Sequence, residues 1–90
     1  MRVYFYIQRR VHNRSGGLAW ETPDWAKNLT MPHAMENWDC IKNQYAKDNQ
    51  YQGRWRLMRA IVHDRRPGKG KARIEKKELA TMRINGGVVK

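Results

Sequence analysis

Cysteine is almost missing from this sequence, since Cys40 is the single one among 90 residues. One cysteine cannot form an internal disulfide, and the chain has neither a C-x-x-C pair nor a Cys/His spacing of the kind that holds zinc. Its histidines also lack i,i+4 spacing or a neighbouring cysteine; they are His12, His33 and His63. We therefore expect a fold held together by packing, without a metal ion or another cofactor.

Long hydrophobic runs and catalytic motifs are missing as well. The apolar stretch in residues 1–8 is too short, and too quickly followed by charge, for a signal peptide or a membrane span, so we expect a cytoplasmic protein. No phosphate-binding loop, nucleophile elbow or carboxylate pair occurs, and we expect neither an enzyme nor a small-molecule substrate. A small nuclease built on His63 and Asp64 is a remote alternative, because geometry rather than composition makes a site.

Acidic residues are scarce: 8 Asp and Glu stand against 19 Lys and Arg, which gives a net charge of +11. A surface this basic repels itself unless an anionic partner or salt screens it. Nucleic acid is the commonest polyanionic partner, ahead of an anionic membrane or an acidic protein surface. The charge therefore predicts a nucleic acid or ribonucleoprotein partner, and a solvated charge excess without function is the alternative.

The first half of the chain has two strand patterns and one helix pattern. Residues 3–11 alternate between apolar and polar, which predicts a half-buried strand, and a glycine-containing turn then allows residues 18–22 to return as a second strand. Thr30 is suited to cap a helix over residues 31–48, in which apolar residues recur every three or four positions. This apolar stripe consists of Ala34, Met35, Trp38, Ile41 and Tyr45.

The second half predicts a third strand and then a segment of different composition. Residues 51–63 are rich in strand formers, but apolar residues fall on both faces of this strand. This pattern indicates either a bulge near Met58 or burial of both faces. It does not decide whether Trp55 is a core or a surface residue. Residues 64–90 carry nine Lys and Arg against three acids. Their second part, residues 74–84, fits either a short helix or a returning hairpin strand.

Together these elements predict an α+β fold: a small antiparallel sheet with one amphipathic helix packed on one face. We expect residues 1–63 to form the compact domain and residues 64–90 to be a basic C-terminal extension.

Aromatic and basic residues meet on the outer face of this predicted sheet. That combination suits single-stranded nucleic acid, because bases stack on aromatic rings with about 1–3 kcal/mol each while cations hold the phosphates. Tyrosine is also favoured in strands for packing alone, so a covering role is the alternative. The candidates on the sheet are Tyr4, Tyr6, Arg10, Arg54 and Arg56.

The basic segment after the third strand offers further phosphate contacts, although it matches no phosphate-loop spacing and could equally be a solubilising linker. Its candidates are Arg65, Arg66, Lys69, Lys71 and Arg73. Trp20 and Trp25 flank an irregular loop and are candidates for a protein interface, since tryptophan is enriched at binding hot spots. They support the alternative of an adaptor or inhibitor that binds an acidic protein surface.

In outline, the order MRVYFYIQRR strand, PHAMENWDCIKNQYAKDNQ helix and GRWRLMRAIV basic strand resembles small phage-encoded accessory proteins, including anti-CRISPR inhibitors of host defence. The resemblance covers residues 1–63 in architecture only, so no binding residue is carried over from it. It implies a non-catalytic protein in the host cytoplasm that blocks or modulates a nucleic acid or a nucleoprotein. Many such inhibitors are acidic, whereas this chain is basic, which makes DNA mimicry implausible.

Overall fold

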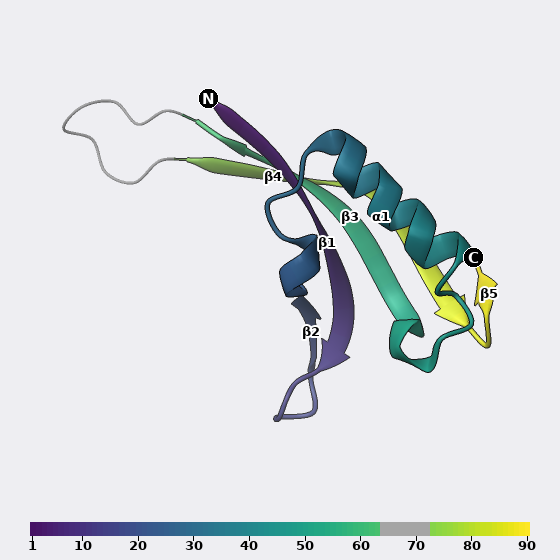
Figure 1. Ribbon diagram of the computed structural model, residues 1–90. Helices are drawn as coiled ribbons and strands as arrows, with labels where there is room; N and C mark the ends of the chain where they lie inside the picture. Colours follow the sequence, from purple (N-terminus) through teal and green to yellow (C-terminus); the bar gives the residue numbers. More distant parts are fainter. Residues whose placement is uncertain (64–72) are drawn as a thin grey trace.

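The structure is a computed structural model that describes residues 1–63 and 73–90. In these two stretches the chain forms a five-stranded antiparallel sheet in the order β2-β1-β3-β4-β5, with one α-helix across it (Figure 1). The α+β class predicted from the sequence is confirmed. The strands are β1 (Arg2–His12), β2 (Leu18–Glu21), β3 (Gly53–Val62), β4 (Ile74–Asn85) and β5 (Val88–Val89). The helices are η1 (Asp24–Ala26), α1 (Met31–Asn43) and η2 (Asn49–Tyr51).

β3 is the central strand, and its neighbour β1 pairs with β2 near its end and with β3 along most of its length. The predicted alternation of β1 has a clear structural basis: Ile7 is fully buried toward the helix, while Tyr4 and Gln8 lie on the other side. Beyond β2 the chain returns to the same edge, where Leu29 and Phe5 exchange two backbone hydrogen bonds of 2.7 and 2.9 Å. These contacts bring the loop that precedes α1 beside the sheet.

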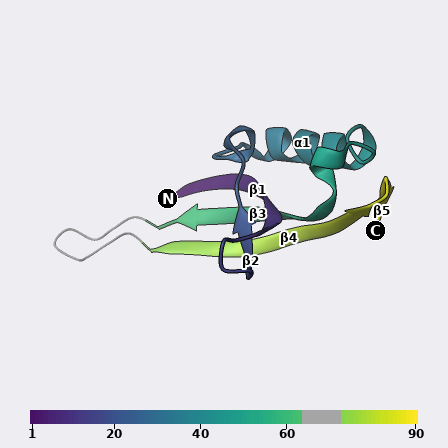
Figure 2. The same ribbon diagram turned by 90° about the horizontal axis from the view of Figure 1, so that it is seen from below.

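α1 packs against one face of the sheet and leaves the other without a helix (Figure 2). The predicted cap is present: the Thr30 hydroxyl accepts a hydrogen bond from the His33 amide at 3.4 Å. The core between α1 and the sheet contains Trp55 at 1% exposure, and its indole N–H donates to the Tyr51 carbonyl at 2.9 Å, so Trp55 is a core residue. The main buried residues of this core are Ile7, Ala34, Trp38, Ile41, Trp55, Leu57, Met82 and Ile84.

The predicted end of the helix is wrong, because α1 ends at Asn43 rather than at residue 48. The Cys40 carbonyl accepts from both the Gln44 and the Tyr45 amides, which widens the last turn and ends the regular spacing. Tyr45 therefore leaves the buried stripe and is exposed, with its ring stacked on Tyr51 at 4.8 Å between ring centres. Met35, also assigned to the stripe, is exposed.

Of the two alternatives for the third strand, the structure has burial of both faces: Trp55 and Leu57 are buried toward α1 and Met58 and Ala60 on the other side, and the register of β3 against β1 is continuous. The irregularity near Met58 lies in the neighbouring strand β4. Its register against β3 shifts between Leu57, which pairs with Ala80, and Met58, which pairs with Glu78, so that Leu79 of β4 is the extra residue. The bulge turns Met82 toward the core and Arg83 away from α1.

Of the two alternatives for residues 74–84, the structure has the strand, and the sheet and its core continue well beyond residue 63. The predicted phosphate contacts Arg65, Arg66, Lys69 and Lys71 lie outside the described residues.

Candidate nucleic-acid interface

The face of the sheet opposite α1, here called the helix-free face, brings side chains of four strands together. Three cross-strand rows define it, because side chains directly opposite one another share a face. The rows are Tyr4, Ala60 and Lys76; Tyr6, Met58 and Glu78; and Gln8, Arg56 and Thr81.

Charge is divided unevenly along the chain. Residues 22–50, which supply α1 and its flanking loops, contain four acids and three lysines and carry a net charge of −1. All other residues together contain sixteen Lys and Arg and four acids, a net charge of +12. The basic character therefore belongs to the sheet and the segments that extend it, not to the helix layer.

The basic side chains of the helix-free face have no acidic partner among the described residues. The ion pairs of the described residues involve other cations, such as Arg9 with Glu21 and Lys27 with Asp24. Glu78 is the one acid on the helix-free face within residues 1–63 and 73–90. The unpaired cations of this face are Arg2, Arg10, Arg54, Arg56, Lys76 and Arg83.

Trp20 of β2 contacts two arginines of the helix-free face. The guanidinium carbons of Arg56 and Arg10 lie over its ring, 4.1 and 5.4 Å from the ring centre, a geometry typical of cation–π contacts. The Arg56 Nε also donates to Gln8 Oε1 at 2.8 Å, and Gln8 Nε2 donates to the Thr22 hydroxyl at 3.0 Å. Two arginines are thus held in place by a ring and an amide, without neutralisation of their charge.

To one side of Trp20 lies a hollow of 380 Å³, here called the tyrosine hollow. Tyr4 is partly exposed there, with the Arg2 guanidinium carbon 5.2 Å from its ring centre. Tyr6 is only 7% exposed, packed beside Met58 and Ala60, so its ring offers little surface for stacking. The hollow is lined by Arg2, Tyr4, Tyr6, Gln8, Thr22, Lys27, Asn28 and Lys76.

Burial also sets the protonation of Tyr6. Removal from water raises the pKa of its phenol, the nearby Tyr4 raises it further, and Arg56 opposes the shift. Tyr6 is therefore a neutral hydroxyl at physiological pH, and its main contribution is to support the ring of Tyr4, 5.9 Å away between ring centres.

To the other side of Trp20 lies a second hollow of 360 Å³, here called the arginine hollow. Three strands each contribute an arginine to it, and no carboxylate of the described part of the chain lines it. Arg54 and Arg83 are direct cross-strand partners in the register of β3 and β4. The hollow is lined by Arg10, His12, Leu18, Gly53, Arg54 and Arg83.

The predicted sheet candidates Tyr4, Tyr6, Arg10, Arg54 and Arg56 all lie on the helix-free face. Arg73 stands apart, 4.0 Å from Glu75.

Sequence reasoning missed several residues of the helix-free face. Arg2 was visible in the alternation of β1, whereas Arg83 was hidden by the bulge at Leu79, and the cross-strand pairing that brings Trp20 beside Arg10 was not available from the sequence. The missed residues are Arg2, Lys27, Lys76 and Arg83, and Trp20 was assigned to a protein interface instead.

The two tryptophans assigned to a common protein interface lie on opposite sides of the sheet. Trp20 is on the helix-free face, whereas Trp25 is 6.1 Å from the core residue Trp55 and 6.3 Å from Tyr51 between ring centres. Trp25 is 44% exposed, but it belongs to the part of the chain with net negative charge. An acidic partner surface is not electrostatically complementary there.

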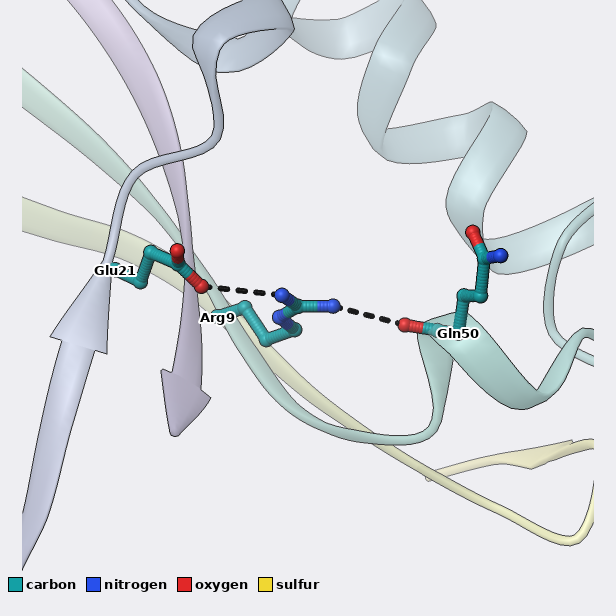
Figure 3. A network of polar contacts seen from close by, with 3 residues as sticks. All are labelled: Arg9, Glu21 and Gln50. Atoms are coloured by element: carbon teal, nitrogen blue, oxygen red, sulfur yellow. Dashed lines mark hydrogen bonds and ion pairs between the residues drawn. The ribbon is translucent and has the colours of Figure 1, made fainter. Parts of the chain in front are cut away.

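Arg9 shows how the other side of β1 uses a cation. Its guanidinium donates to Glu21 of β2 and to the Gln50 carbonyl of η2, each at 3.0 Å (Figure 3), and lies 5.8 Å from the ring centre of Trp55. This arginine ties three segments together and its charge is paired.

Among residues 1–63 and 73–90, no helix is long and apolar enough to cross a membrane. The same stretches contain no cluster of three potential metal ligands. For the nuclease alternative, His63 Nε2 lies 3.9 Å from Glu75 Oε2, and Asp64 is outside the described residues.

No protein-family model matches this chain, and no curated protein or solved structure matches it either. The resemblance to phage-encoded accessory proteins therefore stays a prediction.

Proposed function

We propose that this protein binds single-stranded nucleic acid through the helix-free face. The observation that carries the proposal is the set of six cations without acidic partners, interleaved with Tyr4 and Trp20 on one side of the sheet. Unpaired cations can take up phosphates and release the counterions of the strand, which is the main source of affinity for nucleic acid. The helix layer, with its net charge of −1, has no comparable capacity.

The tyrosine hollow favours an unpaired strand over a duplex. Tyr4 offers part of an aromatic ring for stacking, and the unpaired cations Arg2 and Lys76 line the same hollow. Gln8 and Asn28 add amide groups that can hydrogen-bond to a base edge. A base can enter such a hollow only when it is not stacked and paired inside a duplex.

A strand held on this face is covered by protein and is less accessible to other factors. By covering the strand, the protein would block or modulate the factors that use it. This is the role expected from the sequence, including action on a ribonucleoprotein or as a phage inhibitor of host defence. In this proposal the protein acts by occupying the strand, without a chemical step.

The proposal is tested by fluorescence anisotropy of labelled single-stranded RNA, single-stranded DNA and duplex DNA over a range of salt concentrations. If about five phosphates are neutralised, the slope of log K against log salt is about −3.5 for single strands. We expect Tyr4→Ala to weaken single-strand binding roughly 5- to 150-fold, as expected for loss of one stacked base. Tyr45→Ala, on the helix side, is the matched control and keeps wild-type affinity.

Equal affinity for duplex and single strands, together with no effect of Tyr4→Ala, would contradict the proposal and reduce the charge to nonspecific attraction.

A further inference from the structure

The arginine hollow has a feature that packing alone does not explain. Arg54 on β3 and Arg83 on β4 are directly opposite each other, and Arg10 from β1 lines the same space. Like charges directly opposite on neighbouring strands destabilise a sheet. Here three of them converge, and neither the lining nor the ion pairs of the described residues supply an acid.

The three like charges repel one another and destabilise the free protein, and an anion bound in the hollow would reduce this repulsion. Guanidinium groups present planar pairs of N–H donors that match phosphate oxygens, whereas a halide offers no such geometry. His12 lines the same hollow and offers a further ring N–H donor. The donor set therefore fits a phosphate group better than a simple ion.

We infer that the arginine hollow is a phosphate-binding site, which holds a phosphate of the strand bound on the helix-free face. The inference rests on the proposed function and gives Arg83, with Arg10 and Arg54, a defined ligand group. Arg10 belongs both to this hollow and to the contact with Trp20, so a phosphate seated there lies next to the aromatic residue in the middle of the face. The hollow thereby fixes where the strand lies relative to Trp20 and the tyrosine hollow.

A binding site built from mutually repelling residues has an unusual signature: its loss stabilises the free protein. In phosphate-free buffer we expect Arg83→Gln to raise the melting temperature by about 1–6 °C, because one like-charge contact is removed from a domain of this size. Addition of inorganic phosphate raises the melting temperature of the wild type more than that of Arg83→Gln. Arg83→Lys keeps the charge but loses the planar donor pair, and its response lies between the two.

The same variants are then titrated with a single-stranded oligonucleotide, once with hydroxyl ends and once with a 5′-phosphate. We expect Arg83→Gln to lose about tenfold in affinity, the size typical of one hydrogen bond to a charged group. An equal loss with both oligonucleotides assigns the hollow to an internal phosphate, and a loss confined to the phosphorylated one assigns it to the strand end. Lys42→Gln, which removes one charge from α1, is the control and changes affinity less than twofold.

Two outcomes separate this inference from the proposed function. If Arg83→Gln behaves like Lys42→Gln in both assays while Tyr4→Ala still loses affinity, the hollow is not a phosphate site and the proposed function stands. If no oligonucleotide binds the wild type but inorganic phosphate still stabilises it through Arg83, the phosphate site stands and the proposed function is overturned.

Discussion

Arg9 and Arg10 are neighbours in the sequence but lie on opposite sides of β1, and their surroundings differ. Arg9 is paired with Glu21 and bonded to the Gln50 carbonyl (Figure 3), and it lies near the ring of the core residue Trp55. Arg10 lies over Trp20 and lines the arginine hollow, and it forms no ion pair within residues 1–63 and 73–90. The helix-covered side uses its arginine to hold segments together, and the helix-free side leaves its arginine available.

The comparison teaches that the number of basic residues is less informative than their pairing. A cation whose charge is already neutralised has little left to offer a polyanion, and one held by a ring or an amide keeps its full charge. Substitutions on the helix-covered side should therefore mainly lower stability, and substitutions on the helix-free side should mainly lower affinity. Each of the following experiments tests that division.

The largest effect on stability is expected from the helix-covered side. Trp55→Ala removes the largest fully buried side chain and leaves a cavity in the core, which typically lowers the free energy of unfolding by about 3–5 kcal/mol. Urea unfolding followed by circular dichroism measures the loss. A loss below about 1 kcal/mol would mean that the core does not depend on this residue and that the two sides are less distinct than described.

The largest effect on binding is expected from the helix-free side. Arg10→Gln combined with Arg56→Gln removes two unpaired cations and should lower single-strand affinity on the order of 100-fold, with unfolding changed by less than about 1 kcal/mol. Lys42→Gln with Lys47→Gln has the same net charge and is the matched control. Equal losses for the two double variants would show that total charge, not the helix-free face, determines binding.

Arg9→Gln is expected to have the opposite effects to the double variant of Arg10 and Arg56: a loss of stability with little loss of affinity. It breaks a partly exposed ion pair and a hydrogen bond between segments, so the free energy of unfolding should fall by about 1 kcal/mol. Affinity should change less than about threefold, because the charge of Arg9 is already paired. Comparison of Arg9→Gln with the single variant Arg10→Gln by anisotropy and urea unfolding checks both values, and a larger loss of affinity for Arg9→Gln would contradict the comparison.

Gln8→Ala sharpens the role of preorganisation on the helix-free face. Gln8 does not carry charge but accepts from Arg56 Nε and donates to Thr22. Without it Arg56 keeps only the ring of Trp20, and we expect a loss in affinity of about tenfold, the lower end of what one hydrogen bond to a charged group contributes. Unchanged affinity would indicate that the position of Arg56 does not matter.

The smallest effect concerns pH. Burial raises the pKa of Tyr6 above its ordinary 10.0, so folding favours the neutral phenol. The stability from this preference is present below pH 10.0 and is lost as the pH rises through the folded pKa. Melting temperatures between about pH 9 and 11 should fall more steeply for the wild type than for Tyr6→Phe, with Tyr45→Phe as an exposed control. Parallel curves for all three proteins would contradict the assignment.

The sequence predicted the elements whose evidence is local. Alternation in β1 and the capping residue Thr30 both follow from neighbours in the chain, and both have their expected places in the structure. The end of α1 was not predictable, because the spacing continues to Tyr45 while a hydrogen bond to Cys40 and stacking on Tyr51 end the helix.

The candidate site was predicted in part for the same reason. The strand pattern placed Tyr4, Arg10 and Arg56 on a common face, but it could not place residues from strands whose register depends on a bulge or a hairpin. Arg83 turns to the helix-free face through the extra residue Leu79, and Trp20 reaches Arg56 through pairing of β2 with β1.

The four tryptophans allow the most direct test of the claim that binding belongs to the helix-free face. Trp20 lies on that face, whereas Trp38 and Trp55 are in the core beneath α1 and Trp25 contacts Trp55. We would titrate ¹⁵N-labelled protein with a single-stranded oligonucleotide and follow the four indole N–H signals, assigned by Trp→Phe substitution. The account predicts a large shift for Trp20 and small shifts for the other three. A dominant shift of Trp25 with Trp20 unmoved would contradict it and place the interface on the helix side.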